Sequence, residues 1–338
     1  MKKLILFSTI ITAGFAAQAQ ANLPKDVATT FSKPTPPDGD TTRKNGWLKG
    51  AVLSLSATQI SNSGWLAAGG DEFSLTLAAS ANAFLSKRWD NGMSWNNNID
   101  LNYGIVNTTT LGVRKVNDRI DYITKLGYEP KSWKNVKIAL LGQFRSQFSD
   151  GYDYDYYGSG TKRRNSGFMA PAYVVLAPGI DWTPKPWLSI FASPAATRWT
   201  IVSNDPYSYA AADGEFPDPK NPGQFIRETP LATLYGVDTL KRVKTEFGAF
   251  VTISMRKDIF KNVKYIGRVD LYSDYLGVAS NVSILSTNQF LLKVNKWLQV
   301  TYEIDFLDDD NIKNPDRPTH AQGLQVLSTL GIGFAAKL

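Results

Sequence analysis

The stretch GLQVLSTLGIGFAAKL, residues 323–338, decides the fold. Its side chains alternate between an apolar parity and a small or polar parity, and a two-residue period is typical of a β-strand. The apolar set is Leu324, Val326, Leu330, Ile332, Phe334, Ala336 and Leu338, and the other set is Gln325, Thr329, Gly331, Gly333 and Lys337. We expect this strand to close a membrane β-barrel. Leu338 departs from the pattern, because such barrels commonly end in an aromatic residue.

The first 45 residues predict export. Lys2 and Lys3 precede a short apolar run, and small residues at positions 17, 19 and 21 offer cleavage sites, so residues 1–21 resemble a secretory signal peptide. Residues 22–45 are rich in proline and polar residues and predict a flexible periplasmic leader. The remaining residues, 46–338, are the predicted barrel.

About twelve segments of this region alternate with the period of a strand, each of the length that a tilted barrel strand needs. They are residues 49–60, 72–86, 94–106, 119–128, 136–148, 170–183, 187–202, 245–256, 263–275, 282–294, 298–306 and 323–338. Pro171, Pro178 and Pro194 weaken the sixth and seventh segments, since proline removes a ladder donor. The pattern predicts an all-β fold, a transmembrane antiparallel up-and-down β-barrel. A soluble secreted β-sandwich is the alternative.

The connections alternate in length. Those after the second, fourth, sixth, eighth and tenth segments are short, and the others are mostly long, including residues 107–118 and 203–244. Outer-membrane barrels have short periplasmic turns and long extracellular loops. Aromatic residues recur in or beside the short turns and predict a girdle at one membrane interface, the alternative being core aromatics of a soluble β-protein: Trp89, Trp133, Trp187, Phe260 and Trp297.

Several longer strings carry a family resemblance. They include SNSGWLAAGGDEFSL (61–75), SWNNNIDLNYG (94–104), RKVNDRIDYITKLGY (114–128), FMAPAYVVLAPGIDW (168–182) and VKTEFGAFVTISMRKDIFKNV (243–263). Together they resemble an uncharacterised family of Bacteroidota envelope proteins, a domain of unknown function, over residues 46–338. The resemblance implies an outer-membrane β-barrel of a Gram-negative bacterium and implies no activity.

Charged residues on the polar parity predict the lining of the lumen. Basic and acidic residues are nearly balanced there, which favours a narrow or plugged interior. The candidate lumen or binding residues are Arg145, Glu303, Asp305, Arg268, Asp270, Glu246, Arg256 and Asp100. The fifth and eleventh segments are half a barrel apart, so we expect Arg145 to face Glu303 and Asp305 across the lumen. Opposed charges would orient dipolar solutes, or they would simply stabilise the interior.

Little in the sequence indicates catalysis. His320 is the single histidine and lies in a polar loop, so a Ser–His lipid hydrolase is disfavoured and we expect no enzyme activity. Acidic residues at 308–310 and at 150–155 lack EF-hand spacing, and we expect no metal and no cofactor. The net charge of +7 is scattered over 338 residues, so nucleic acid is not an expected partner.

The sequence therefore favours a narrow passive channel for small solutes in the outer membrane. A structural or interaction barrel, a subunit of a larger outer-membrane assembly, is the alternative, and a barrel enzyme acting on lipid comes third. The expected partners are outer-membrane lipid, the barrel-assembly machinery during insertion and other outer-membrane proteins.

Overall fold

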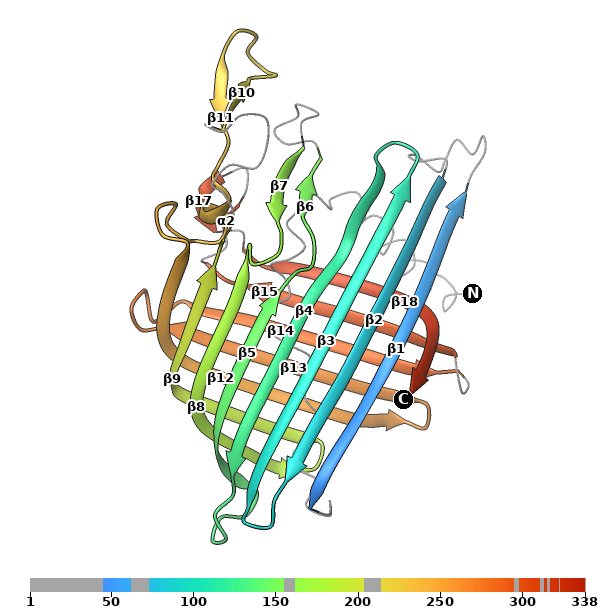
Figure 1. Cartoon of the computed structure of the whole chain (residues 1–338), viewed down its shortest axis with the longest axis vertical. Helices are drawn as coiled ribbons and strands as arrows, with labels where there is room; N and C mark the ends of the chain where they lie inside the picture. The colour runs from blue at the N-terminus through green and yellow to red at the C-terminus, as the bar shows by residue number, and fades with distance from the viewer. Residues whose placement is uncertain are drawn as a thin grey trace, which may run out of the picture.

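Twelve antiparallel strands close into a barrel in the computed structural model (Figure 1). The structure describes residues 45–61, 73–154, 162–203, 214–294, 298–310, 313–314, 317–321 and 323–337. The predicted signal peptide, nearly all of the leader, Trp297 and Leu338 lie outside these residues. No helix among the described residues is long and apolar enough to cross a membrane.

The barrel strands follow the chain in order, so each pairs with its neighbours in sequence. They are β1 (Gly46–Ser61), β2 (Phe73–Arg88), β3 (Met93–Thr108), β4 (Gly112–Tyr128), β5 (Val136–Ser146), β8 (Ala172–Lys185), β9 (Leu188–Ile201), β12 (Val243–Phe260), β13 (Val263–Asp274), β14 (Val282–Lys293), β15 (Leu298–Asp308) and β18 (Gln325–Lys337). The predicted all-β, up-and-down barrel is confirmed, and every predicted segment corresponds to one of these strands.

The barrel closes where β18 pairs with β1. This seam holds four residue pairs, from Val52 with Lys337 to Leu55 with Phe334. On its other side β18 pairs with β15 over ten positions, from Leu298 with Phe334 to Leu307 with Gln325. The stretch that decided the fold is therefore the closing strand, and its seam with β1 is short.

Alternation along the strands separates an outer apolar surface from a polar interior. On β5, Ile138 and Leu140 are exposed, whereas Lys137 and Arg145 are buried. Leu324 and Val326 are likewise exposed on the parity predicted to face lipid. An exposed apolar surface around a closed sheet is the surface that a transmembrane barrel presents to lipid.

The two prolines in the middle of β8 and β9 lie where the ladder is interrupted. Regular pairing stops at Leu176 and resumes at Ile180, and Pro178 falls in this gap. Ser193 Oγ donates a hydrogen bond to the Pro178 carbonyl oxygen at 2.7 Å and accepts one from the Ala195 amide at 3.3 Å. A side chain thus satisfies backbone groups at the irregularity, which is how these strands tolerate proline.

One predicted connection was wrong. Residues 107–118 were expected to form a long loop, but β3 and β4 continue as a hairpin and only residues 109–111 join them. The register shifts at a bulge between Gly104 and Ile105, and pairing continues beyond it to Thr108 and Gly112.

Three of the long connections, those after β5, β9 and β15, contain structure of their own (Figure 1). Three short hairpins occur in them, formed by β6 (Gly151–Asp153) with β7 (Arg163–Ser166), β10 (Glu215–Pro217) with β11 (Phe225–Arg227) and β16 (Lys313–Asn314) with β17 (Arg317–Ala321). A one-turn helix, α2 (Leu231–Leu234), follows β11. We call this end of the barrel the long-loop end and the opposite end the short-turn end.

Candidate functional site in the barrel lumen

The interior of the barrel is the candidate site, because charged side chains converge there from most strands. They form three groups: one around Arg198, a middle group around Arg145, Arg119 and Arg268, and one around Lys125. In each group a basic side chain meets carboxylates of its own strand or of a strand at most two places away in the sheet, and most of these side chains are almost completely buried.

Arg198 on β9 is the centre of the first group. Its guanidinium donates two hydrogen bonds to the Glu246 carboxylate, at 2.6 and 3.1 Å, and approaches Asp309 at 3.5 Å. It also lies over the Tyr272 ring, 4.3 Å from the ring centroid. Lys244 adds an ion pair to Glu246 at 3.0 Å. Strand-to-strand register explains the main pair, since Glu246 is the direct partner of Arg198 across β12 and β9.

The middle group contains three arginines and five carboxylates. Arg145 forms a short ion pair with Asp121 on the adjacent strand, and Gln143 donates to the same carboxylate at 3.3 Å. Arg268 bonds Asp270 at 2.7 Å and Thr252 at 3.1 Å. Arg119 approaches Asp100 at 3.8 Å. Glu303 and Asp305 complete the group through electrostatic interaction with Arg119.

Lys125 and Asp181 form the group toward the short-turn end. The Lys125 ammonium lies 2.7 Å from the Asp181 carboxylate, and Ser189 donates to the same carboxylate at 2.8 Å. Lys137 lies at the start of β5, close to the short-turn end, and is 3% exposed. Its ammonium has no hydrogen-bond partner in the described part of the chain. A buried ammonium without a partner is costly, which makes Lys137 an unusual residue for a purely structural interior.

Apolar side chains fill the interior next to the Arg198 group, on the same two strands, β9 and β12. Phe191 and Phe250 lie with ring centroids 6.3 Å apart and are each at most 1% exposed. The same buried cluster extends to Leu231, Leu234 and Val237 in and after α2. Because α2 contacts β7 and β16, this apolar cluster extends from the barrel interior into the long-loop end.

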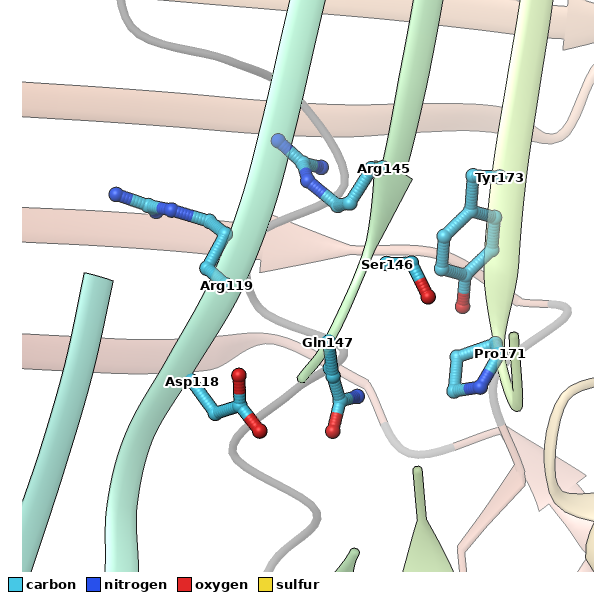
Figure 2. A pocket seen from close by; sticks show the side chains of 7 residues that line it. All are labelled: Asp118, Arg119, Arg145, Ser146, Gln147, Pro171 and Tyr173. Atoms are coloured by element: carbon cyan, nitrogen blue, oxygen red, sulfur yellow. The ribbon is translucent and has the colours of Figure 1, made fainter. Parts of the chain in front are cut away.

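A small pocket opens beside the middle group, where β4, β5 and β8 approach the long-loop end (Figure 2). Its empty volume is about 210 Å³, and its lining consists of Asp118, Arg119, Arg145, Ser146, Gln147, Pro171 and Tyr173. Figure 2 shows the hydroxyls of Ser146 and Tyr173 on the side of the pocket where Pro171 lies. Arg145 Nε and Nη1 are buried and have no hydrogen-bond partner among the described residues. The pocket is polar and small.

Asp118 holds the rim of this pocket. Its carboxylate accepts hydrogen bonds from the backbone amides of Phe148 and Ser149, at 2.7 and 2.8 Å, and from Lys115 at 3.2 Å. Lys115 also donates to Gln147 at 2.8 Å. One buried carboxylate thus fixes the start of the loop that follows β5.

The predicted lumen residues lie on the inner face of the sheet, but not all in the predicted arrangement. Arg145, Glu246, Arg268, Asp270, Asp100 and Asp305 are buried there, whereas Glu303 and Arg256 are half-buried. Glu303 accepts a hydrogen bond from Gln289 at 2.8 Å. Arg145 was expected to face Glu303 and Asp305. Instead it pairs with Asp121 on the neighbouring strand, and Arg119 is the arginine that interacts with the two acids.

Sequence reasoning missed Arg198, Arg119 and Asp181. Arg198 was hidden because Pro194 obscured the alternation of its segment. The signal was present in ATRWTI, residues 196–201, where Ala196, Arg198 and Thr200 share the inner parity. Arg119 shares the inner parity of β4 with Asp121, and Asp181 shares that of β8 with Thr183, so the same alternation identifies them.

The predicted girdle residues lie at the short-turn end. Trp89 and Trp133 are in the turns after β2 and β4, Trp187 precedes β9, and Phe260 ends β12. Phe260 is 71% exposed and Trp133 is 41% exposed. Large aromatic side chains exposed at one level around a barrel are typical of a membrane interface.

Among the described residues, no group of three or more histidine, cysteine or acidic side chains could hold a metal ion. The chemistry available in the lumen is therefore that of ion pairs, amides and hydroxyls, which bind and orient polar groups.

The closed sheet, its apolar exterior and its charged interior define an outer-membrane β-barrel. A family model described as a protein of unknown function (DUF3078) matches residues 55–152. The predicted resemblance to a domain of unknown function is thus confirmed over that range, and a Bacteroidota source stays a prediction. A search of curated proteins found no match to the chain.

Among solved structures, the chain is similar to an outer-membrane channel from Pseudomonas putida F1, with 9% identity, a TM-score of 0.41, and coverage of 90% of this chain and 100% of the other. It is also similar to the translocator domain of the autotransporter NalP from Neisseria meningitidis, with 7% identity, a TM-score of 0.39, and coverage of 96% and 98%. The NanC porin matches with 12% identity, a TM-score of 0.31, and coverage of 86% and 100%.

Proposed function

We propose that this protein is an outer-membrane barrel that forms a narrow, gated path for small polar solutes. It is exported through a cleaved signal peptide, and the short turns face the periplasm. The observation that supports the proposal is the concentration of buried charge inside a membrane-spanning sheet. Ionisable residues at membrane depth are expensive and mark pathways more often than structural filling.

Burial supports a closed conformation. Lumen side chains that line an open aqueous pore are accessible to water, whereas Asp121, Arg145 and Asp270 are at most 3% exposed. Replacing buried ion pairs by apolar side chains of similar volume is often neutral or stabilising, so stability alone does not require them. Ion pairs that can exchange partners are a means by which a closed polar interior admits a polar solute.

Planar-bilayer recording tests the proposal. We expect the wild-type barrel to show low conductance, and we expect D121A/R145A, which removes the volume of the central ion pair, to conduct more. R227A/E215A is the matched control, because Arg227 and Glu215 form a 3.0 Å ion pair in the β10–β11 hairpin with both side chains about half exposed. If wild type and D121A/R145A both fold and neither passes ions, the channel proposal fails.

An interaction barrel is the second candidate. The β10–β11 hairpin projects beyond the other loops (Figure 1), and Phe225 on it is 68% exposed. An exposed aromatic residue on a projecting hairpin suits a protein contact. Purification in mild detergent distinguishes this role: a partner that co-purifies with wild type and is lost in F225A supports it, and a barrel that stays monomeric argues against it.

A further inference from the structure

The short-turn end carries a ring of lysines among its aromatic residues. Lys131 and Lys134 flank Trp133 in the turn after β4, and Lys261 follows Phe260 in the turn after β12. Lys87 lies near the end of β2, beside Trp89, and Lys257 lies near the end of β12, beside Trp187. We call Lys87, Lys131, Lys134, Lys185, Lys257 and Lys261 the basic ring.

Contacts place these ammonium groups at the level of the aromatic side chains. Lys87 Nζ lies 4.9 Å from the Trp47 ring centroid and 4.8 Å from that of Trp89. Lys257 Nζ lies 4.9 Å from the Trp187 ring centroid. Since tryptophan marks the headgroup level of a membrane, Lys87 and Lys257 lie at that level too.

The positive charge of the ring is not neutralised by the protein. The described turns hold three acidic residues, Asp90, Glu129 and Asp258, against the six lysines of the ring, and Asp258 already pairs with Lys264 at 3.6 Å. Lys131, Lys134 and Lys261 are exposed and have no ion-pair partner among the described residues. Exposed ammonium groups beside aromatic rings at headgroup depth suit a phosphate diester.

We propose that the basic ring binds the phosphate groups of anionic phospholipids in the leaflet at the short-turn end. Several turns contribute to the ring, so it faces lipid around the barrel. Lysines close to an anionic membrane surface attract its lipids, and the attraction weakens with salt. This inference needs the membrane-spanning barrel but does not depend on whether the lumen conducts.

Quenching of tryptophan fluorescence by brominated lipid tests it. Trp89, Trp133 and Trp187 lie in the ring's own turns, and Trp47, Trp95 and Trp182 lie within three residues of this end of their strands. We reconstitute the full chain in phosphatidylcholine vesicles that contain either brominated phosphatidylglycerol or brominated phosphatidylcholine. At low salt we expect the relative binding constant to favour phosphatidylglycerol at least about threefold.

Two triple variants remove equal charge from the two ends. K131Q/K134Q/K261Q is expected to bring the preference close to one. K162Q/K220Q/K241Q, at the long-loop end, is expected to keep it. No preference in wild type, or an equal loss in both variants, overturns the proposal.

A competition arm separates lipid from free phosphate as the source of the ligand. Inorganic phosphate is compared with chloride at matched ionic strength. Equal effects support the lipid headgroup. Selective loss of the lipid preference in phosphate shows a site for the free anion and overturns the assignment to lipid.

Discussion

The buried pair of Arg198 and Glu246 makes the most quantitative prediction. In E246A the Arg198 guanidinium loses two hydrogen bonds, of 2.6 and 3.1 Å, while its side chain stays 4% exposed and cannot turn to water. Removing one partner of a buried ion pair costs about 3–5 kcal/mol. Asp309, at 3.5 Å, still offsets part of the charge, so we expect a loss of about 3 kcal/mol.

Urea unfolding in lipid vesicles, followed by tryptophan fluorescence, measures this loss of unfolding free energy. E215A is the matched control, because Glu215 forms an ion pair of similar length with Arg227 in the exposed β10–β11 hairpin. Exposed pairs contribute at most about 1 kcal/mol, so E215A should unfold close to wild type. Equal effects of E246A and E215A, or a loss below about 1 kcal/mol in E246A, would refute the packed, ion-paired lumen.

Other predictions test the lipid face, the rim and the sheet. L140R should destabilise the barrel in vesicles by about 2–4 kcal/mol if Leu140 faces lipid near the midplane; an unchanged urea midpoint contradicts this. D118A removes the acceptor of the Phe148 and Ser149 amides, so limited proteolysis should cut the loop after β5 faster, and an unchanged rate counts against the anchoring role. G248A would place a Cβ 1.7 Å from the Ser273 carbonyl oxygen, so little folded, heat-modifiable barrel should form; normal folding yield refutes that close approach.

The barrel could be predicted because its pattern is local. Alternation along β5 or β18 depends on each strand alone, and alternating turn lengths depend on the chain order of the strands. The predicted bounds failed where pairing continued past the expected membrane edge. In β3 and β4 the hairpin continues past the bulge at Gly104. The residues beyond it are largely polar and were predicted to form a loop.

The partners inside the lumen could be predicted less well, because they depend on register and barrel tilt. Parity alone places Arg145 inside but does not say which acid it meets. Asp121 on β4 is directly opposite Arg145 on β5, so Arg145 contacts an acid on the neighbouring strand rather than one on β15. The packing of Leu231 and Leu234 against the interior depends on a loop whose return to the barrel has no periodic signal.

Thiol reactivity of single cysteines at Ala139 and Leu140 tests the central claim most directly, since the chain has no native cysteine. The two residues are adjacent on β5, Ala139 at 4% exposure toward the interior and Leu140 at 43% toward lipid. In vesicles, neither A139C nor L140C should react readily with a charged, water-soluble reagent, whereas K131C in a turn should react at once. L140C alone of the β5 pair should react with a lipid-soluble maleimide. Rapid reaction of A139C with the charged reagent would show an open lumen. Rapid reaction of L140C with the same charged reagent would show that the outer face does not meet lipid.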